Sequence, residues 1–274
     1  MNEEKKSNYQ ETGKKRNTID KFYTNPKIVN KYIDKFKPYI VKGDLIIEPS
    51  AGCGTWTTPL HMFNLIAFDI QPEGEGIQQM NFLHVDLYAF QSNLHFIGNP
   101  PFGRQSSLAK KFIKHICSCE KTQTIAFILP KSFKKDSFQK VFPPHFHLEY
   151  QDDVDKDAFL ANGKPHDVPC VFQIWRKKDT KRVIPEKLKP KGFIFVKQEE
   201  NPDYSLRRVG VNAGILSKDI LDKSPQSHYF IKLKQNSDLF IIKYQQIYWE
   251  HNNTVGPKSI SKQEFIREIK KINI

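Results

Sequence analysis

Short apolar runs that end in turns, separated by segments with helical spacing, constrain this chain more than any other feature. The runs comprise residues 45–47, 65–68, 94–97 and 124–129. Continuous apolar runs are typical of parallel strands, because helices cover both faces of a parallel sheet. The alternation of such strands with helical segments therefore predicts an α/β domain with a mostly parallel sheet.

The flanking residues predict where the other elements begin and end. Asn25 is a good N-cap and Pro26 suits the first helical position, so we expect a helix there whose apolar face is Ile28, Val29, Tyr32, Ile33 and Phe36. Helices are also predicted over residues 108–116 and 132–141, and a strand around 82–85 that ends in Asp86. A late strand over 169–175 follows a turn instead of a helix, which favours an antiparallel strand. The expected sheet is thus Rossmann-like and doubly wound, with a late antiparallel strand.

Composition changes along the chain indicate four segments. Residues 1–17 are polar and expected to be loose, residues 18–178 form the α/β domain, and residues 179–192 are a basic linker with two prolines. Residues 193–274 are predicted to form a small, basic α+β module. Its apolar stretches are 193–196 and 229–231, and a capping box of Ser261 and Glu264 begins a closing helix.

Charge is distributed unevenly over these segments. The net charge is +13, and from Arg176 onward 21 Lys and Arg face 11 Asp and Glu, which leaves +3 for residues 1–175. This asymmetry favours a polyanion-binding C-terminal part, with a lysine-rich surface for solubility as the alternative. The four cysteines form no CxxC pair, so we expect reduced thiols and no metal. Without a long apolar run or a signal segment, the protein is expected to be soluble, intracellular (cytoplasm or nucleus) and without a membrane partner.

A glycine-bearing turn, Glu48-Pro49-Ser50-Ala51-Gly52-Cys53-Gly54, follows the first strand. Gly52 and Gly54 lack the Cβ atoms that would keep a ligand from the backbone, although a simple tight turn is the alternative reading. The third glycine of a dinucleotide fingerprint and the GK[ST] of a phosphate loop are both missing. Glu48 would repel a phosphate and attract an ammonium group, while Asp69 can accept hydrogen bonds from ribose hydroxyls. A cationic, ribose-bearing ligand without phosphate fits S-adenosylmethionine.

A second motif, Asn99-Pro100-Pro101-Phe102, follows the strand of residues 94–97. Two consecutive prolines stiffen the loop and leave carbonyl oxygens without competing N–H donors. The Asn99 side-chain oxygen and the Pro100 carbonyl could each accept a proton of an exocyclic amine, which would direct the nitrogen lone pair at a methyl donor. Phe102 offers a face on which an extruded base could stack. The alternative is a loop that Pro-Pro merely stiffens.

Together, Asp20-Lys21-Phe22-Tyr23-Thr24, the Glu48–Gly54 turn and the Asn99–Phe102 loop resemble the N6-adenine branch of the S-adenosylmethionine-dependent amino-methyltransferases. The resemblance spans about Asp20 to Lys178. It implies that Phe22, Tyr23 and Thr24 line the methionine end of the donor, and that Glu48, Gly52 and Gly54 bound it. It further implies that Asp69 holds the ribose, that Asp86 meets the adenine amine, and that residues 157–175 form a hairpin beside the target base. Phe159 is a candidate contact there, and a core position is the alternative.

Other activities fit the motifs less well. Protein glutamine methyltransferases share an Asn-Pro-Pro-aromatic loop, usually with Tyr, but need no basic C-terminal unit. Cytosine-N4 enzymes more often carry Ser in place of Asn99, and a nonenzymatic Rossmann-like binder would not need the stereochemistry of this loop. The order of the motifs favours DNA as the polymer. Phe102 also occurs in RNA adenosine methyltransferases, so RNA stays open.

In the C-terminal module, Arg207, Arg208, His228 and Tyr229 are candidate nucleic-acid contacts. Arginines suit phosphates or guanine edges, and His and Tyr rings can stack on bases. The alternative is a β-turn platform with scattered surface charge. The sequence does not indicate an oligomeric state.

Overall fold

The structure is a computed structural model that describes residues 23–161, 164–234, 237–249, 254 and 257–272. The expected loose N-terminus of residues 1–17 and Phe22 lie outside the described residues. The chain divides into two compact units. The first comprises Met1–Phe127 and Asp155–Asp167, and the second Ile128–Val154 and Val168–Ile274.

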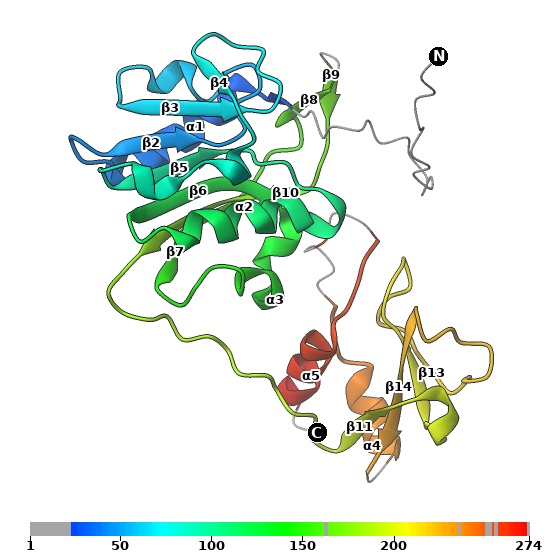
Figure 1. Cartoon of the computed structure of the whole chain (residues 1–274). Helices are drawn as coiled ribbons and strands as arrows, with labels where there is room; N and C mark the ends of the chain where they lie inside the picture. Colours follow the sequence, from blue (N-terminus) through cyan, green and yellow to red (C-terminus); the bar gives the residue numbers. More distant parts are fainter. Residues whose placement is uncertain (1–22, 162–163, 235–236, 250–253, 255–256, 273–274) are drawn as a thin grey trace, which may run out of the picture. The chain divides into compact units, whose positions relative to one another are not determined.

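A seven-stranded sheet has the order β4-β3-β2-β5-β6-β10-β7. Its parallel strands are β2 (Leu45–Glu48), β3 (Leu65–Asp69), β4 (Ile77–Gln79), β5 (Leu94–Gly98) and β6 (Thr122–Pro130) (Figure 1). The chain proceeds outward from β2 to β4, returns to place β5 on the other side of β2, and continues outward to β6. This reversal confirms the predicted doubly wound α/β fold and creates a switch point between β2 and β5, where open sheets bind ligands.

The first unit confirms the predicted first helix. The helix α1 spans Pro26–Phe36, and the Asn25 side chain accepts a hydrogen bond from the Lys27 amide at its N-terminus. All five predicted apolar residues of this helix are buried. The helix α2 (Ser107–Ser118) extends beyond the predicted 108–116 and buries Ala109, Phe112, Ile113 and Ile116. Ahead of α1, the short strand β1 (Tyr23–Thr24) pairs with the hairpin of β8 (Phe159–Ala161) and β9 (Lys164–His166).

Two predicted elements are wrong. Residues 82–84 form a 3-10 turn, and the third parallel strand is the earlier and more polar β4, of which only Ile77 is half-buried. The apolar residues at 82–85 therefore fill the core from a turn. The predicted helix over 132–141 is broken into a 3-10 turn and the single helical turn α3 (Asp136–Gln139).

In the second unit, β7 (Phe146–Asp153) and β10 (Cys170–Lys177) form an antiparallel pair. The strand β10 confirms the predicted late antiparallel strand, whereas β7 was not predicted. Its exposed and half-buried residues outnumber its buried ones, as suits a strand at the edge of the sheet.

The chain after the linker forms the expected α+β arrangement. A four-stranded antiparallel sheet has the order β11-β14-β12-β13, formed by Phe193–Val196, His228–Leu233, Tyr204–Arg207 and Leu216–Ser217. Helices α4 (Ser237–Tyr244) and α5 (Lys262–Lys271) accompany it, and α5 begins with the predicted capping box. An aromatic core joins Phe193, Phe240 and Phe265. Among the described residues, no helix has the length and apolar character needed to cross a bilayer.

Candidate functional site

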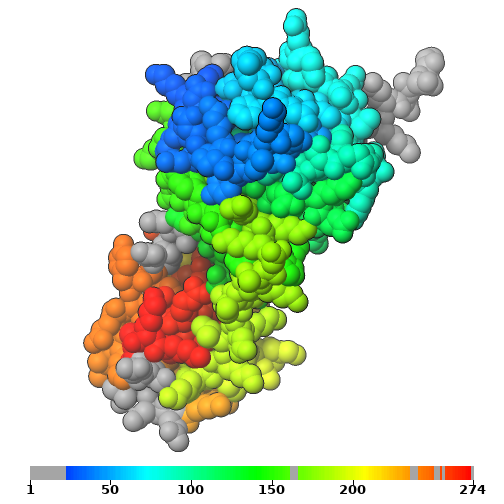
Figure 2. Space-filling view, turned by 90° about the vertical axis from the view of Figure 1, so that its left-hand side faces the viewer, coloured from blue at the N-terminus to red at the C-terminus, as the bar shows by residue number. Residues whose placement is uncertain are grey.

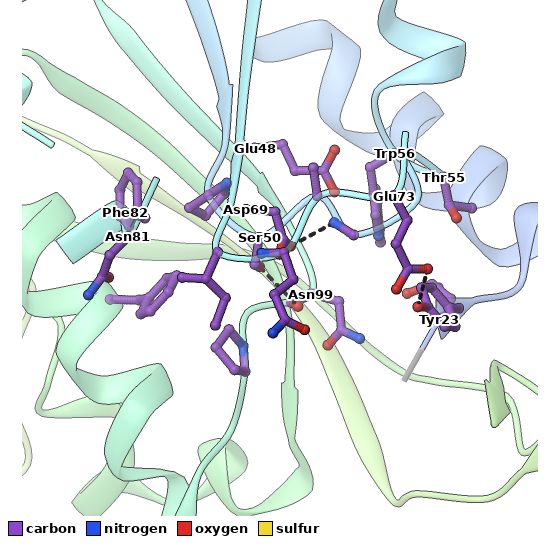
Figure 3. Close-up of a pocket in the computed structure, with 18 of the residues that line it drawn as sticks. Tyr23, Glu48, Ser50, Thr55, Trp56, Asp69, Glu73, Asn81, Phe82 and Asn99 are labelled. Atoms are coloured by element: carbon purple, nitrogen blue, oxygen red, sulfur yellow. Dashed lines mark hydrogen bonds between the residues drawn. The ribbon is translucent and has the colours of Figure 1, made fainter. Parts of the chain in front are cut away.

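A cavity of about 250 Å³ lies within the first unit at the carboxyl ends of β2, β3 and β5 (Figure 3). It therefore occupies the switch point that the sheet topology creates. Among the described residues, the lining includes acidic, amide, hydroxyl and apolar side chains but no Lys, Arg or His. These residues are Tyr23, Thr24, Glu48, Pro49, Ser50, Ala51, Gly52, Thr55, Trp56, Asp69, Ile70, Gln71, Glu73, Asn81, Phe82, Leu83, Asn99, Pro101, Leu108 and Phe112.

The glycine turn forms one wall and needs glycine at its centre. Gly52 has φ +55°, and a Cβ there would lie 3.4 Å from the Tyr23 ring. Its N–H donates to Asp69 Oδ2 at 2.8 Å, and its carbonyl accepts from the Glu73 amide at 2.9 Å. Asp69 also accepts from the Gln71 amide through Oδ1 at 2.7 Å. Asp69 thus fixes the turn, and each of its oxygens keeps acceptor capacity toward the cavity.

Glu48 is the most unusual ionisable group of the cavity. Its side chain is 1% exposed, and neither carboxylate oxygen has a hydrogen-bond partner among the described residues. Burial, and then the nearby Asp69 carboxylate, raise the pKa of Glu48 well above its ordinary value. Gly98 lets the chain pass close to it, because a Cβ there would lie 3.3 Å from Glu48 Cγ. A buried carboxyl without a partner indicates that a ligand completes this site.

Tyr23 and Glu73 meet at another side of the same cavity. The Tyr23 hydroxyl donates to Glu73 Oε2 at 2.6 Å (Figure 3). Burial, followed by this hydrogen bond, raises the pKa of Tyr23 to about 12, so Tyr23 stays protonated at neutral pH. With Glu48 and Asp69, the described lining of the cavity has three carboxyl groups and no basic residue. This electrostatic character suits a cation and opposes a phosphate.

The Asn99–Phe102 loop brings its first and third residues, Asn99 and Pro101, to the cavity, whereas Pro100 is buried and is not among the lining residues. Ser50 Oγ donates to the Asn99 carbonyl at 3.2 Å, which ties the loop to the glycine turn. The Phe102 carbonyl accepts from the Leu108 amide at 3.1 Å and the Ala109 amide at 3.4 Å, so the loop end is fixed to α2. The loop is thus held at both ends beside the cavity.

Asp86 does not line the cavity. It caps the 3-10 turn Leu87–Ala89 by accepting a hydrogen bond from the Tyr88 amide at 3.0 Å. Because β4 ends at Gln79, the residues that follow the third strand and reach the cavity are Asn81, Phe82 and Leu83. Sequence reasoning also missed Trp56 and Glu73, which lie in loops without a motif. The acidic character of residues 69–75 was the signal available for Glu73.

Phe159 is 1% exposed, which makes it a core residue. The four cysteines are free thiols. Within the described part of the chain, no group of three His, Cys, Asp or Glu side chains is arranged to hold a metal ion.

The candidate contacts of the C-terminal module are largely occupied by internal bonds. Arg207 donates through Nε to the Val209 carbonyl at 2.8 Å, and Arg208 donates to the Gln226 carbonyl at 2.6 Å. The Arg208 guanidinium also lies 5.3 Å from the centre of the Tyr229 ring. His228 is 9% exposed, and burial, then the charges of Arg207 and Lys223, lower its pKa. Nucleic-acid contact by these four residues stays a prediction.

No protein-family model and no curated protein matches the sequence. Several solved structures are similar to it. The 23S rRNA methyltransferase ErmE is 14% identical over 59% of this chain and 71% of its own, with a TM-score of 0.44. A type I restriction-modification methyltransferase subunit from Streptococcus thermophilus is 13% identical over 58% and 45%, with a TM-score of 0.42. A tRNA m1G37 methyltransferase from M. jannaschii is 17% identical over 58% and 50%, with a TM-score of 0.40. At such identities the similarity concerns the fold alone.

Proposed function

We propose that this cavity binds S-adenosylmethionine and that the protein transfers its methyl group to the N6 amine of adenine in nucleic acid, with DNA favoured over RNA. One observation carries the proposal. A cavity whose described lining has three carboxyl groups and no basic residue also includes Asn99 and Pro101 of the rigid loop. The cavity chemistry selects a cationic donor, and the loop chemistry selects an exocyclic amine.

The residues present fit the proposed donor. The partnerless carboxyl of Glu48 suits the donor's ammonium or sulfonium charge, and Tyr23 and Thr24 border the same cavity. Asp69 retains acceptor capacity for ribose hydroxyls, and Ile70 and Phe82 supply apolar surface for a purine ring. When bound, the donor would supply a methyl group on a positively charged sulfur. The S–C bond would break as the N–C bond forms, the sulfur would leave as a neutral thioether, and the methylated amine would lose one proton to solvent.

Asn99 and Pro100 would act on the acceptor amine. The lone pair of an adenine N6 amine is delocalised into the ring, so the nitrogen is a weak nucleophile in the ground state. Hydrogen bonds from the amine protons to Asn99 Oδ1 and the Pro100 carbonyl would favour a pyramidal nitrogen, which resembles the transition state. Phe102 would stack on the extruded base.

The experiment uses donor with a labelled methyl group, incubated with purified protein and one of three acceptors: duplex DNA, RNA of the same sequence, or a glutamine-bearing release factor. We expect label in nucleic acid, and more in DNA than in RNA. Label confined to RNA would reverse the polymer preference. Label in the protein acceptor with unmodified nucleic acid would contradict the proposal.

A further inference from the structure

The excess positive charge is concentrated in one segment of the second unit, between the end of β10 and the start of β11. Residues 176–191, here called the basic strap, contain eight Lys and Arg and two acidic residues. By contrast, residues 193–274 contain 13 basic and 9 acidic residues. The strap therefore carries a net charge of +6 in 16 residues, against +4 in the 82 residues from 193 to 274, so the positive charge is much denser in the strap.

The first half of the strap is fixed to the loop that precedes β7. The Lys178 amide donates to the His145 carbonyl and the Arg182 amide to the Pro144 carbonyl, each at 2.8 Å. The Arg182 guanidinium donates to the Gln139 carbonyl at 3.0 Å and the Phe142 carbonyl at 2.8 Å, and lies 5.2 Å from the Trp175 ring centre. The Arg182 guanidinium is therefore occupied by contacts within the protein.

The second half is fixed to helix α5. Leu188 and Gln263 exchange two hydrogen bonds, with the Leu188 amide donating at 2.7 Å and the Gln263 amide group donating to the Leu188 carbonyl at 3.1 Å. The Leu188 side chain packs against the aromatic core of the C-terminal module. The strap (yellow-green in Figures 1 and 2) has no regular secondary structure after β10. Hydrogen bonds nevertheless fix each of its halves to a neighbouring part of the protein.

Exposure alternates along residues 187–191. Lys187, Lys189 and Lys191 are exposed, whereas Leu188 and Pro190 are half-buried. In an extended chain, alternate residues share one side and lie about 6.5 Å apart. No ion pair to any of these three lysines occurs among the residues that the structure describes. By comparison, Lys131, Lys135 and Lys178 each face a carboxylate.

We propose that the basic strap is a docking surface for the phosphodiester backbone of nucleic acid, with Lys187, Lys189 and Lys191 as its main contacts. A row of unpaired cations held on one side of an extended segment suits a linear polyanion, and its fixation lowers the entropy lost on binding. This inference rests on the proposed function and assigns the polymer contact to the strap, ahead of Arg207 and Arg208.

The test compares two full-length variants with equal net charge. One is Lys187→Gln/Lys189→Gln/Lys191→Gln. The control is Lys42→Gln/Lys218→Gln/Lys234→Gln, whose lysines are exposed elsewhere. Affinity for a 30-base-pair DNA duplex and for RNA of the same sequence is measured between ~50 and ~200 mM salt, and donor affinity and thermal unfolding are measured in parallel.

We expect the strap variant to bind nucleic acid on the order of 100-fold more weakly at ~0.1 M salt, with its log–log salt slope reduced by about 2–3. The control variant should stay close to wild type, and donor affinity should not change in either. Equal weakening in both variants, or none in the strap variant, would overturn the strap inference alone. If the wild-type protein binds neither polymer, the proposed function fails as well. Strap-dependent binding to phosphatidylserine vesicles, with nucleic-acid binding unaffected, would overturn the inference in favour of a membrane surface.

Discussion

Replacing Glu48 with Gln should make the unliganded protein more stable and lower its affinity for the donor. The substitution keeps the shape of the side chain and removes its ionisable carboxyl. Because burial and Asp69 raise the pKa of Glu48, the folded protein binds its proton more tightly than the unfolded chain does. The stability that this proton provides is fully present below the ordinary value of 4.5 and is lost as the pH rises toward the raised pKa.

The size of the effect has an upper bound. Roughly 2.5 pH units separate the ordinary value from pH 7, and at ~1.36 kcal/mol for each unit the cost to the wild-type protein reaches at most ~3.4 kcal/mol. At about 2–4 °C for each kcal/mol, the melting temperature of Glu48→Gln at pH 7 should exceed that of wild type by up to ~14 °C. The difference should shrink toward zero as the pH approaches 4.5.

Donor binding should change in the opposite direction. A cation beside Glu48 stabilises the charged carboxylate, so binding releases a proton and wild-type affinity rises with pH. Calorimetry in buffers of different ionisation enthalpy measures this proton, which the Gln variant should not release. A variant that is less stable than wild type at pH 7, or that binds donor with unchanged affinity and pH dependence, would contradict this role of Glu48.

Asp44 provides the matched control at the other end of β2. Burial alone would raise its pKa, but hydrogen bonds from the Val41 amide, Asn93 and His95 outweigh burial and lower it. A lowered carboxyl pKa contributes stability at neutral pH that is lost as the pH falls below 3.8. Asp44→Asn should therefore destabilise the protein at pH 7 and leave the cavity unchanged.

Four further substitutions test the geometry. Gly52→Ala should lower both the unfolding free energy, by about 1–2 kcal/mol, and donor affinity, because φ is +55° and the new Cβ would contact the Tyr23 ring; denaturant titration and calorimetry measure the two. Asp69→Asn should weaken donor binding at least tenfold, because the glycine turn loses a hydrogen bond to the carboxylate. Asp86 lies outside the cavity, so the donor affinity of Asp86→Asn should stay within about twofold of wild type in the same assay. Arg182→Ala should lower the free energy of unfolding by about 1–3 kcal/mol in a denaturant titration, because two carbonyl groups lose their hydrogen-bond donor. An unchanged unfolding midpoint would show that Arg182 does not fix the strap.

The sequence predicts those helices and strands that are marked by a capping residue or by a run of apolar residues that is buried in the fold. The Asn25 cap, the Ser261 capping box and the four apolar runs gave correct helices and strands because caps and fully buried strands are specified by a few neighbouring residues. The strand predicted around residues 82–85 was wrong because an apolar run does not distinguish a buried strand from a buried turn. The edge strand β7 was missed because it lacks a continuous apolar run.

The cavity was predictable in part. The strand ends that carry Glu48, Asp69 and Asn99 were identified, since parallel strands bring their carboxyl ends to one edge of the sheet. Asp86 was selected because a strand was predicted before it, and the true strand ends earlier, which gives the cavity Asn81 instead. Glu73 reaches the cavity from a loop, and its bond to Tyr23 joins positions 50 residues apart, which no local pattern encodes.

Mass spectrometry of nucleosides identifies the methylated atom and the polymer that carries it. Duplex DNA and matched RNA are incubated with donor and either wild-type protein or Asn99→Ala, then digested to nucleosides. We expect N6-methyladenine from the wild-type reaction, more in DNA than in RNA. We also expect a loss of about 100-fold or more with Asn99→Ala at nearly unchanged donor affinity. Methylation at another position of the base, or N6-methyladenine formed equally well by the variant, would contradict the proposed function.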